Sequence, residues 1–135
     1  MSWLPRQMRW LMWLSGALTC TMLYFAVAPE AAQQSNFGAA LSGPVADVVV
    51  RSWGVLVALV GGMLIYGALT PAHRTPMVVV AAVSKLTFVL LVLTYGRELL
   101  AYQVRTAVIV DSFWVVVFFA YLIGPKGDAG SYFNR

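Results

Sequence analysis

The sequence has one cysteine, one histidine and five acidic residues in 135 positions. A single cysteine, Cys20, cannot form an internal disulfide, a CxxC redox pair or a cysteine-based metal site within one chain. The single histidine, His73, cannot supply a bis-histidine haem or a histidine-rich copper or zinc site. The acidic residues are scattered and form no carboxylate pair: Glu30, Asp47, Glu98, Asp111 and Asp128. These absences argue against an autonomous hydrolase, kinase or metalloenzyme, and we predict no metal site.

Charge is also scarce. Only 10% of the residues are charged and 61% are apolar, whereas a soluble domain averages about 25% charged and about 45–50% apolar. The net charge is +4, but the nine Lys and Arg residues are scattered singly and form no basic run. Nucleic-acid binding needs a basic patch, so nucleic acid is not an expected partner. The mean hydropathy of +0.80 indicates a membrane protein.

Four long apolar runs dominate the chain, and we predict transmembrane helices at residues 10–28, 44–70, 76–95 and 104–123. A helix of the first length rises about 28 Å, close to the roughly 30 Å hydrocarbon core. Barrel strands would be only about 9–11 residues long, with alternating polarity. The predicted fold class is therefore all-α. A single domain, residues 1–135, is expected to form an integral membrane four-helix bundle with antiparallel, up-down-up-down helices.

The segments between the runs support this topology. Residues 29–43 are rich in Gln, Ser, Asn and Gly, which is typical of a loop. The connections at 71–76 and 96–103 are short, so each following helix is expected to return beside the one before it. At the start of the second helix, Asp47 and Arg51 stand four residues apart, in the order that favours an interface ion pair.

The basic residues predict an orientation. The side of the membrane that holds both termini and the second connection carries Arg6, Arg9, Arg74, Lys126 and Arg135, and the other side carries Arg51, Arg97 and Arg105. The excess of basic residues lies on the cytoplasmic side of most membrane proteins. Both termini are therefore expected in the cytoplasm of a multi-pass cell-membrane protein. The short loops favour a bacterial inner membrane.

Small residues recur at intervals of four in the second apolar run, at Gly54, Ala58 and Gly62. Rows of this kind let helix backbones approach closely, so we predict that this face is a helix-packing seam. The first apolar run offers a matching stripe of small and mildly polar residues, namely Ser15, Gly16, Thr19 and Cys20. Whether the seam packs within the bundle or on another protein stays open.

Lys85 and Asp111 are the two ionisable residues that we place well inside the bilayer. Each intramembrane charge costs about 2.5–3.5 kcal/mol on insertion scales, so the two side chains are expected to pair between the third and fourth helices. One interpretation is structural: a buried pair that sets helix register, or a lysine that reaches toward the interface. The other interpretation is functional.

Two stretches of the sequence, FGAALSGPVADVVVRSWGVLVALVGGMLIYGAL and PAHRTPMVVVAAVSKLTFVLLVL, resemble small four-span proteins of the DoxX-like kind. The matching elements are an Arg-x-Trp-Gly entry to the second helix (Arg51, Trp53, Gly54), a basic hairpin (Arg74), and Ser84-Lys85 in the third. Founding members of that group are similar to membrane subunits of quinone-linked sulfur oxidoreductases. The resemblance implies a four-span fold and a redox-linked role, with no catalytic residue assigned.

Three functional hypotheses follow. The first is a non-enzymatic accessory subunit that stabilises a larger membrane complex, with another membrane protein or a second copy of the chain (a homo-oligomer) as partner. The second is a redox accessory in which Trp53, Tyr66 or Lys85 helps to bind a quinone, which is the one cofactor under consideration. The third is a small proton or ion transporter that uses Lys85 and Asp111.

Overall fold

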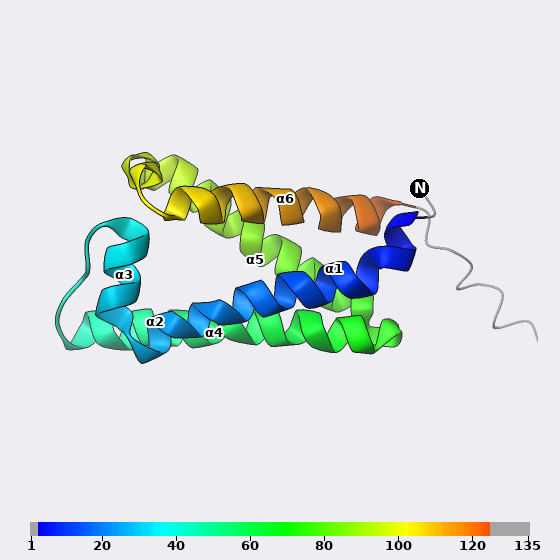
Figure 1. The fold of residues 1–135 in the computed structure, drawn as a ribbon, viewed down its shortest axis with the longest axis horizontal. Coiled ribbons are helices and arrows are strands. Elements are labelled where there is room, and N and C mark those ends of the chain that lie inside the picture. Colours follow the sequence, from blue (N-terminus) through cyan, green and yellow to red (C-terminus); the bar gives the residue numbers. More distant parts are fainter. Residues whose placement is uncertain (1–2, 125–135) are drawn as a thin grey trace, which may run out of the picture.

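The computed structural model describes residues 3–124, and every regular element in this part of the chain is a helix (Figure 1). In chain order the elements are α1 (Trp3–Cys20), η1 (Thr21–Leu23), α2 (Tyr24–Val27), α3 (Pro29–Phe37), α4 (Pro44–Leu69), η2 (Pro71–His73), α5 (Arg74–Tyr95), η3 (Arg97–Ala101) and α6 (Val104–Ile123). Four helical segments are long and apolar enough to cross a membrane: Arg6–Val27, Pro44–Leu69, Pro71–Tyr95 and Val104–Ile123. The predicted number of candidate spans is confirmed for these residues.

The predicted bounds hold well at three of the four spans. The fourth span was expected at 104–123, and α6 covers those residues. The helix α5 begins at Arg74, two residues before the expected start. Pro76 is tolerated there because the first-turn N–H groups of a helix have no intrahelical acceptor. The first span begins earlier than expected, since α1 already starts at Trp3.

The segment expected to be a loop, residues 29–43, contains the nine-residue helix α3, and the loop prediction was wrong there. Pro29 occupies the first turn, and Gly38 ends the helix with a left-handed φ of 74°. The buried Gln33 side chain then holds the following linker, because Nε2 donates to the Pro29 carbonyl at 3.1 Å and Oε1 accepts from the Leu41 N–H at 3.1 Å. Proline at the start and glycine at the end are helix signals that the polar composition obscured.

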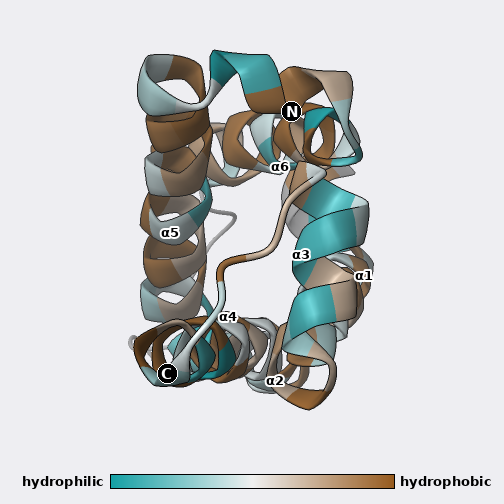
Figure 2. Ribbon diagram, turned by 90° about the vertical axis from the view of Figure 1, so that its left-hand side faces the viewer, coloured by the Kyte–Doolittle hydropathy of each residue, from teal (hydrophilic) through white to brown (hydrophobic). Residues whose placement is uncertain are grey.

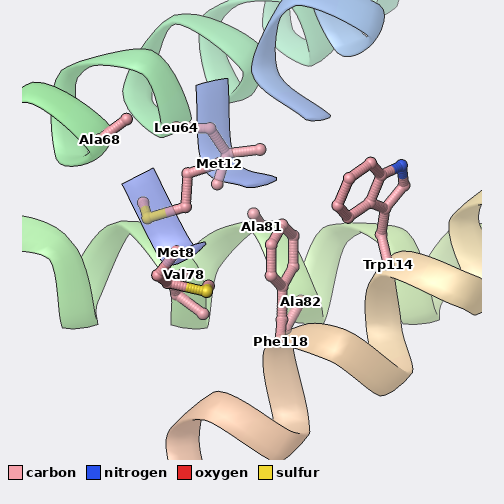
Figure 3. Packing of buried hydrophobic residues seen from close by; sticks show 9 residues of the cluster. All are labelled: Met8, Met12, Leu64, Ala68, Val78, Ala81, Ala82, Trp114 and Phe118. Carbon is pink, nitrogen blue, oxygen red and sulfur yellow. The ribbon is translucent and has the colours of Figure 1, made fainter. Parts of the chain in front are cut away.

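The long helices associate as two pairs, α1 with α4 and α5 with α6. The helix α5 is inclined, so that it lies near α4 at its beginning and near α6 at its end (Figure 1). We call the end of the molecule that holds η2 the η2 end and the opposite one the α3 end. At the η2 end one apolar cluster joins all four long helices (Figure 3): Met8, Met12, Leu64, Ala68, Val78, Ala81, Ala82, Trp114 and Phe118.

At the α3 end the core divides into two clusters. One belongs to α5 and α6 (Val89, Val92, Val104 and Val108), and the other to α2, α3 and α4 (Phe25, Ala32 and Val50). Phe37 packs against both clusters. Figure 2, which looks at the α3 end, shows α5 on one side and α1, α2 and α3 on the other, with the linker from α3 to α4 passing between them. The two helix pairs are thus joined firmly at one end and only lightly at the other.

The seam between α1 and α4 is built from glycines. A Cβ on Gly61 would lie 2.7 Å from the Gly16 carbonyl oxygen, and a Cβ on Gly54 would lie 2.9 Å from the Met22 carbonyl oxygen. Ala58 takes part through its carbonyl oxygen, which lies 3.6 Å from Cys20 Sγ. The backbones therefore approach as closely as the small residues of the two helices predicted.

Gly62 does not belong to the seam between α1 and α4, and its packing on another protein stays a prediction. A Cβ placed on Gly62 would meet nothing within 4 Å, whereas the neighbouring Gly61 is buried. The reason is helical rotation. At about 100° per residue, Gly61 lies roughly 20° from Gly54 around the helix, and Gly62 lies roughly 80° away.

The predicted ion pair between Asp47 and Arg51 is also absent, because within residues 3–124 the ion pair found is that of Lys85 with Asp111. The guanidinium of Arg51 instead donates from Nη1 to the Ala26 carbonyl oxygen at 2.6 Å. Ala26 lies in the last turn of α2, where carbonyl groups have no intrahelical donor. A charge-assisted hydrogen bond to that carbonyl outweighs an exposed ion pair, which is worth only a few tenths of a kcal/mol. Lys126 and Arg135, used in the orientation prediction, lie outside the described residues.

Candidate functional site

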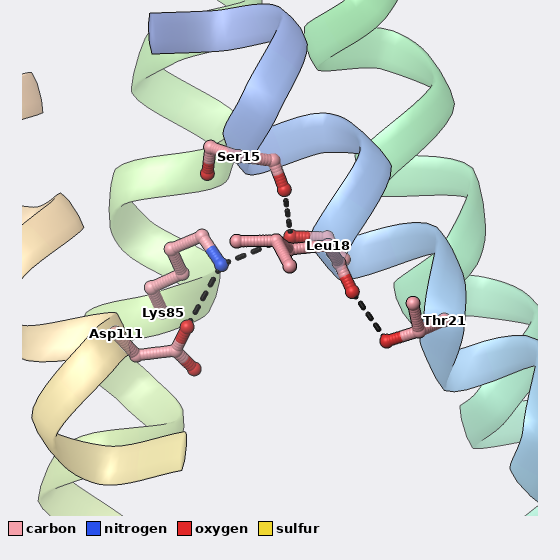
Figure 4. A network of polar contacts seen from close by, with 6 residues as sticks. Ser15, Leu18, Thr21, Lys85 and Asp111 are labelled. Carbon is pink, nitrogen blue, oxygen red and sulfur yellow. Dashed lines mark hydrogen bonds and ion pairs between the residues drawn. The ribbon is translucent and has the colours of Figure 1, made fainter. Parts of the chain in front are cut away.

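Lys85 and Asp111 form the ion pair that the sequence predicts. Lys85 Nζ lies 2.9 Å from Asp111 Oδ1, and it also donates to Thr19 Oγ1 at 3.1 Å (Figure 4). The Thr19 hydroxyl in turn donates to the Ser15 carbonyl oxygen at 2.7 Å. These side chains come from α1, α5 and α6, and we call Thr19, Lys85 and Asp111 the polar triad. It ties the α5/α6 pair to α1.

The triad lies at the edge of the apolar cluster of the η2 end. Ala81 and Ala82 of that cluster precede Lys85 by one turn of α5, and Trp114 follows Asp111 by one turn of α6. Side chains three or four residues apart share one face of a helix, so the cluster and the triad occupy consecutive levels of the same interior face. Ser15 lies one turn before Thr19, and its hydroxyl is buried without a hydrogen-bond partner among residues 3–124.

Beyond the triad, toward the α3 end, a cavity of about 870 Å³ separates the two helix pairs. Its walls are mainly apolar and aromatic, with Trp53, Leu56, Val57, Val60, Phe88 and Leu91 among the lining residues. Polar groups are placed at its two ends. The triad and Ser84 line one end, and Asn36, Gln103 and Thr106 come from the elements nearer the α3 end. This volume falls within the range of about 300–1,000 Å³ that is usual for small-molecule sites.

The two members of the ion pair differ in accessibility. The Lys85 side chain is 8% exposed and the Asp111 side chain is 22% exposed. Asp111 Oδ1 accepts from Lys85, while Oδ2 has no hydrogen-bond partner within the described part of the chain. Figure 4 shows that this second oxygen points away from Lys85. Both residues line the cavity, and the carboxylate of Asp111 is the more accessible member of the pair.

Two of the three residues named for quinone binding, Trp53 and Lys85, line this one cavity. The third, Tyr66, does not line it. Its hydroxyl lies 3.1 Å from His73 Nδ1, on the exposed surface of the η2 end. Thr19, Asn36 and Gln103 line the cavity and were not singled out as site residues. Thr19 had a sequence signal, since it belongs to the polar stripe of the first helix, but its contact with Lys85 spans 66 positions of the chain.

No group of three or more His, Cys, Asp or Glu side chains that could hold a metal ion occurs among residues 3–124. No family model, curated protein or solved structure matches this chain. The resemblance to DoxX-like proteins therefore stays a prediction, and the functional argument starts from the cavity and the polar triad.

Proposed function

We propose that this protein is a four-span membrane protein that binds a lipid-soluble small molecule in the cavity between its helix pairs. The main support for this proposal is a cavity of about 870 Å³ that has apolar walls and the Lys85–Asp111 ion pair at one end. Such a site buries an apolar molecule and orients it through a few polar groups. The proposal includes the antiparallel arrangement of the four spans, with both termini in the cytoplasm of a bacterial inner membrane.

Electrostatics favours a neutral ligand. Lys85 and Asp111 carry opposite charges and contact each other at 2.9 Å, so the pair has no net charge to neutralise an ionic head group. An unpaired charge in a site of low polarity is costly to desolvate. The rings of Trp53 and Phe88 line the cavity and offer flat apolar surfaces. A neutral ring compound of the quinone or hydroquinone class fits these walls.

The geometry supports ligand binding more than the other two hypotheses. An accessory subunit needs packing surfaces but no internal cavity. A proton or ion transporter needs polar groups along the whole route. On the η2 side of the triad, however, a proton or ion would find only Ser15 and then apolar side chains. These belong to the cluster that contains Met8, Met12, Leu64 and Phe118. The polar groups therefore do not continue across the protein, and the cavity is closed at the η2 end.

The proposed topology predicts opposite labelling of two single cysteines, introduced after Cys20→Ala has removed the native thiol. Ser35→Cys, in α3, is expected to react with a membrane-impermeant maleimide added to intact cells. Ala72→Cys, in η2, is expected to react only after the membrane is permeabilised. Equal labelling of both positions from outside the cell would contradict the arrangement.

A cavity-filling substitution tests the binding site. We expect the purified protein in lipid nanodiscs to bind a decyl-substituted quinone or its hydroquinone saturably, as measured by quenching of tryptophan fluorescence. Val57→Trp, inside the cavity, is expected to weaken that binding about tenfold or more, because the indole occupies ligand volume. Val55→Trp is the matched control, since Val55 lies two residues away and is 41% exposed outside the cavity. Absence of saturable binding, or equal effects of the two substitutions, would refute the site.

A further inference from the structure

The geometry points to a more specific ligand class: a molecule with a neutral hydroxyl-bearing head group and a long apolar chain. We infer that the hydroxyl donates to Asp111 and that the chain leaves the cavity between α1 and α6 into the surrounding lipid. This inference rests on the proposed function, because it concerns the same cavity. It adds the hydrogen-bonding character of the head group and the route of the chain.

The oxygen of Asp111 that does not bind Lys85 indicates which kind of head group fits the site. An ionised carboxylate can only accept hydrogen bonds, and Asp111 Oδ2 has no donor within residues 3–124. The Lys85 ammonium has already given two of its three N–H donors, to Asp111 and to Thr19. A ligand oxygen without a proton would therefore face acceptor lone pairs at Asp111. A hydroxyl would satisfy the carboxylate and would add no charge to the site.

Exposed residues that line the cavity indicate where the apolar chain of the ligand leaves it. Leu18 and Thr21 at the α1 side, and Thr106 and Val110 on α6, both line the cavity and reach the surface. The helices α1 and α6 meet at the η2 end, where Met8 and Met12 belong to the same cluster as Trp114 and Phe118. Between that cluster and the α3 end, exposed lining residues stand on both helices, and we place the lateral opening of the cavity there. In the proposed topology this opening faces hydrocarbon.

The opening leads directly to the polar triad. Leu18 precedes Thr19 and Val110 precedes Asp111, so its two rims carry the residues next to two members of the triad. A second lateral rim, formed by Leu56, Thr87 and Leu91, lies between α4 and α5. On that side α5 presents Lys85, which offers only donors and has two of its three N–H groups engaged. The α1/α6 opening is therefore the route that leads to the unpaired acceptor.

The α3 end is more obstructed than the sides. Phe37 packs against the clusters of both helix pairs, and its ring centroid lies 6.1 Å from that of Phe25. The turn after α3 also touches the other helix pair's connection, because a Cβ on Gly38 would overlap the Tyr102 ring. A molecule that approaches from water would have to displace these contacts. One dissolved in the bilayer would enter through the lateral opening without disturbing them.

The head group is tested with two ligands that differ only in the donor, 4-dodecylphenol and its methyl ether. In nanodiscs the wild-type protein is expected to bind the phenol about tenfold more tightly or better, which is the scale of one hydrogen bond to a charged group. The double variant Lys85→Met/Asp111→Asn lacks the carboxylate and is expected to lose most of this preference. Equal affinity of wild-type protein for the two ligands would overturn the hydroxyl assignment.

The chain route is tested with a dodecylphenol that carries a photoreactive diazirine near the middle of its chain. After irradiation, peptide mass spectrometry is expected to locate the label around Leu18–Thr21 or Thr106–Val110. Val110→Trp is expected to reduce labelling several-fold, whereas Val116→Trp, on the same helix at a 67% exposed position, leaves it unchanged. Label at Leu56 or Leu91 would overturn the route while leaving the proposed function intact. If neither ligand and neither quinone form binds saturably, the proposed function itself fails.

Discussion

Lys85→Met is expected to lower the free energy of unfolding by about 3 kcal/mol or more, because removal of one member of a buried ion pair leaves the other unpaired. Asp111 would lose the ammonium that lies 2.9 Å from its Oδ1. Thr19 would lose a donor at 3.1 Å in the same substitution. The Asp111 side chain is 22% exposed, so water in the cavity relieves part of the penalty and the loss falls toward the lower end of the usual range of about 3–5 kcal/mol.

The double variant Lys85→Met/Asp111→Asn is expected to unfold at nearly the wild-type free energy. It removes both charges together, and replacing a buried ion pair as a unit is often close to neutral. Reversible unfolding in mixed detergent micelles, followed by circular dichroism, measures all three proteins under one set of conditions. A double variant as unstable as Lys85→Met would show that the pair contributes more than mutual neutralisation.

This comparison also separates structure from binding. A pair that only sets helix register would leave phenol affinity in the stable double variant unchanged. The proposed role of Asp111 requires that this variant fold and lose its preference for the phenol. Folding and ligand preference are measured independently, so each interpretation of the ion pair has its own outcome.

Gly61→Leu is expected to destabilise the protein by about 3 kcal/mol, at the upper end of the usual cost of overpacking. A Cβ at this position would lie 2.7 Å from the Gly16 carbonyl oxygen and 2.8 Å from the Cys20 backbone nitrogen. Backbone atoms of a packed helix cannot move aside as a flexible side chain can, so α1 and α4 must separate. Thermal unfolding in detergent measures the loss.

Gly62→Leu provides the matched control, because it introduces the same side chain one residue further along α4. Nothing lies within 4 Å of a Cβ at Gly62, so its expected effect is within about 0.5 kcal/mol. A large loss at Gly62 with little effect at Gly61 would place the seam on the other face of α4. Comparable losses at both positions would indicate that the outer face of α4 packs against a second protein.

Much of the fold could be predicted because hydrocarbon imposes simple requirements on a chain. Apolar runs of helix length are needed to cross it, so the sequence predicts the last helix at 104–123, where α6 lies. The same requirement identified Lys85 and Asp111 as partners, since each charge alone is costly in lipid. The helix α3 was missed because it lies outside the apolar runs, where polar composition and helix-terminating residues gave opposite indications.

The cavity could not be predicted, because it depends on how helices are rotated and inclined relative to one another. Gly61 and Gly62 are both glycines in one apolar run, and only packing against Gly16 and Cys20 distinguishes the buried one from the exposed one. Thr19 belongs to the site because it contacts Lys85, which lies 66 positions further along the chain. Tyr66 lies outside the site because its turn of α4 is at the η2 end, beside His73.

By itself the sequence determined the number of long helices, the bounds of the last three to within two residues, and the pairing of Lys85 with Asp111. These properties follow from the composition of single segments and from the cost of placing charge in hydrocarbon. The tertiary structure alone decided which glycine forms the seam, which polar groups join the ion pair and where a cavity remains between the helix pairs. These properties depend on contacts between side chains distant in sequence, which fix the rotation and inclination of each helix.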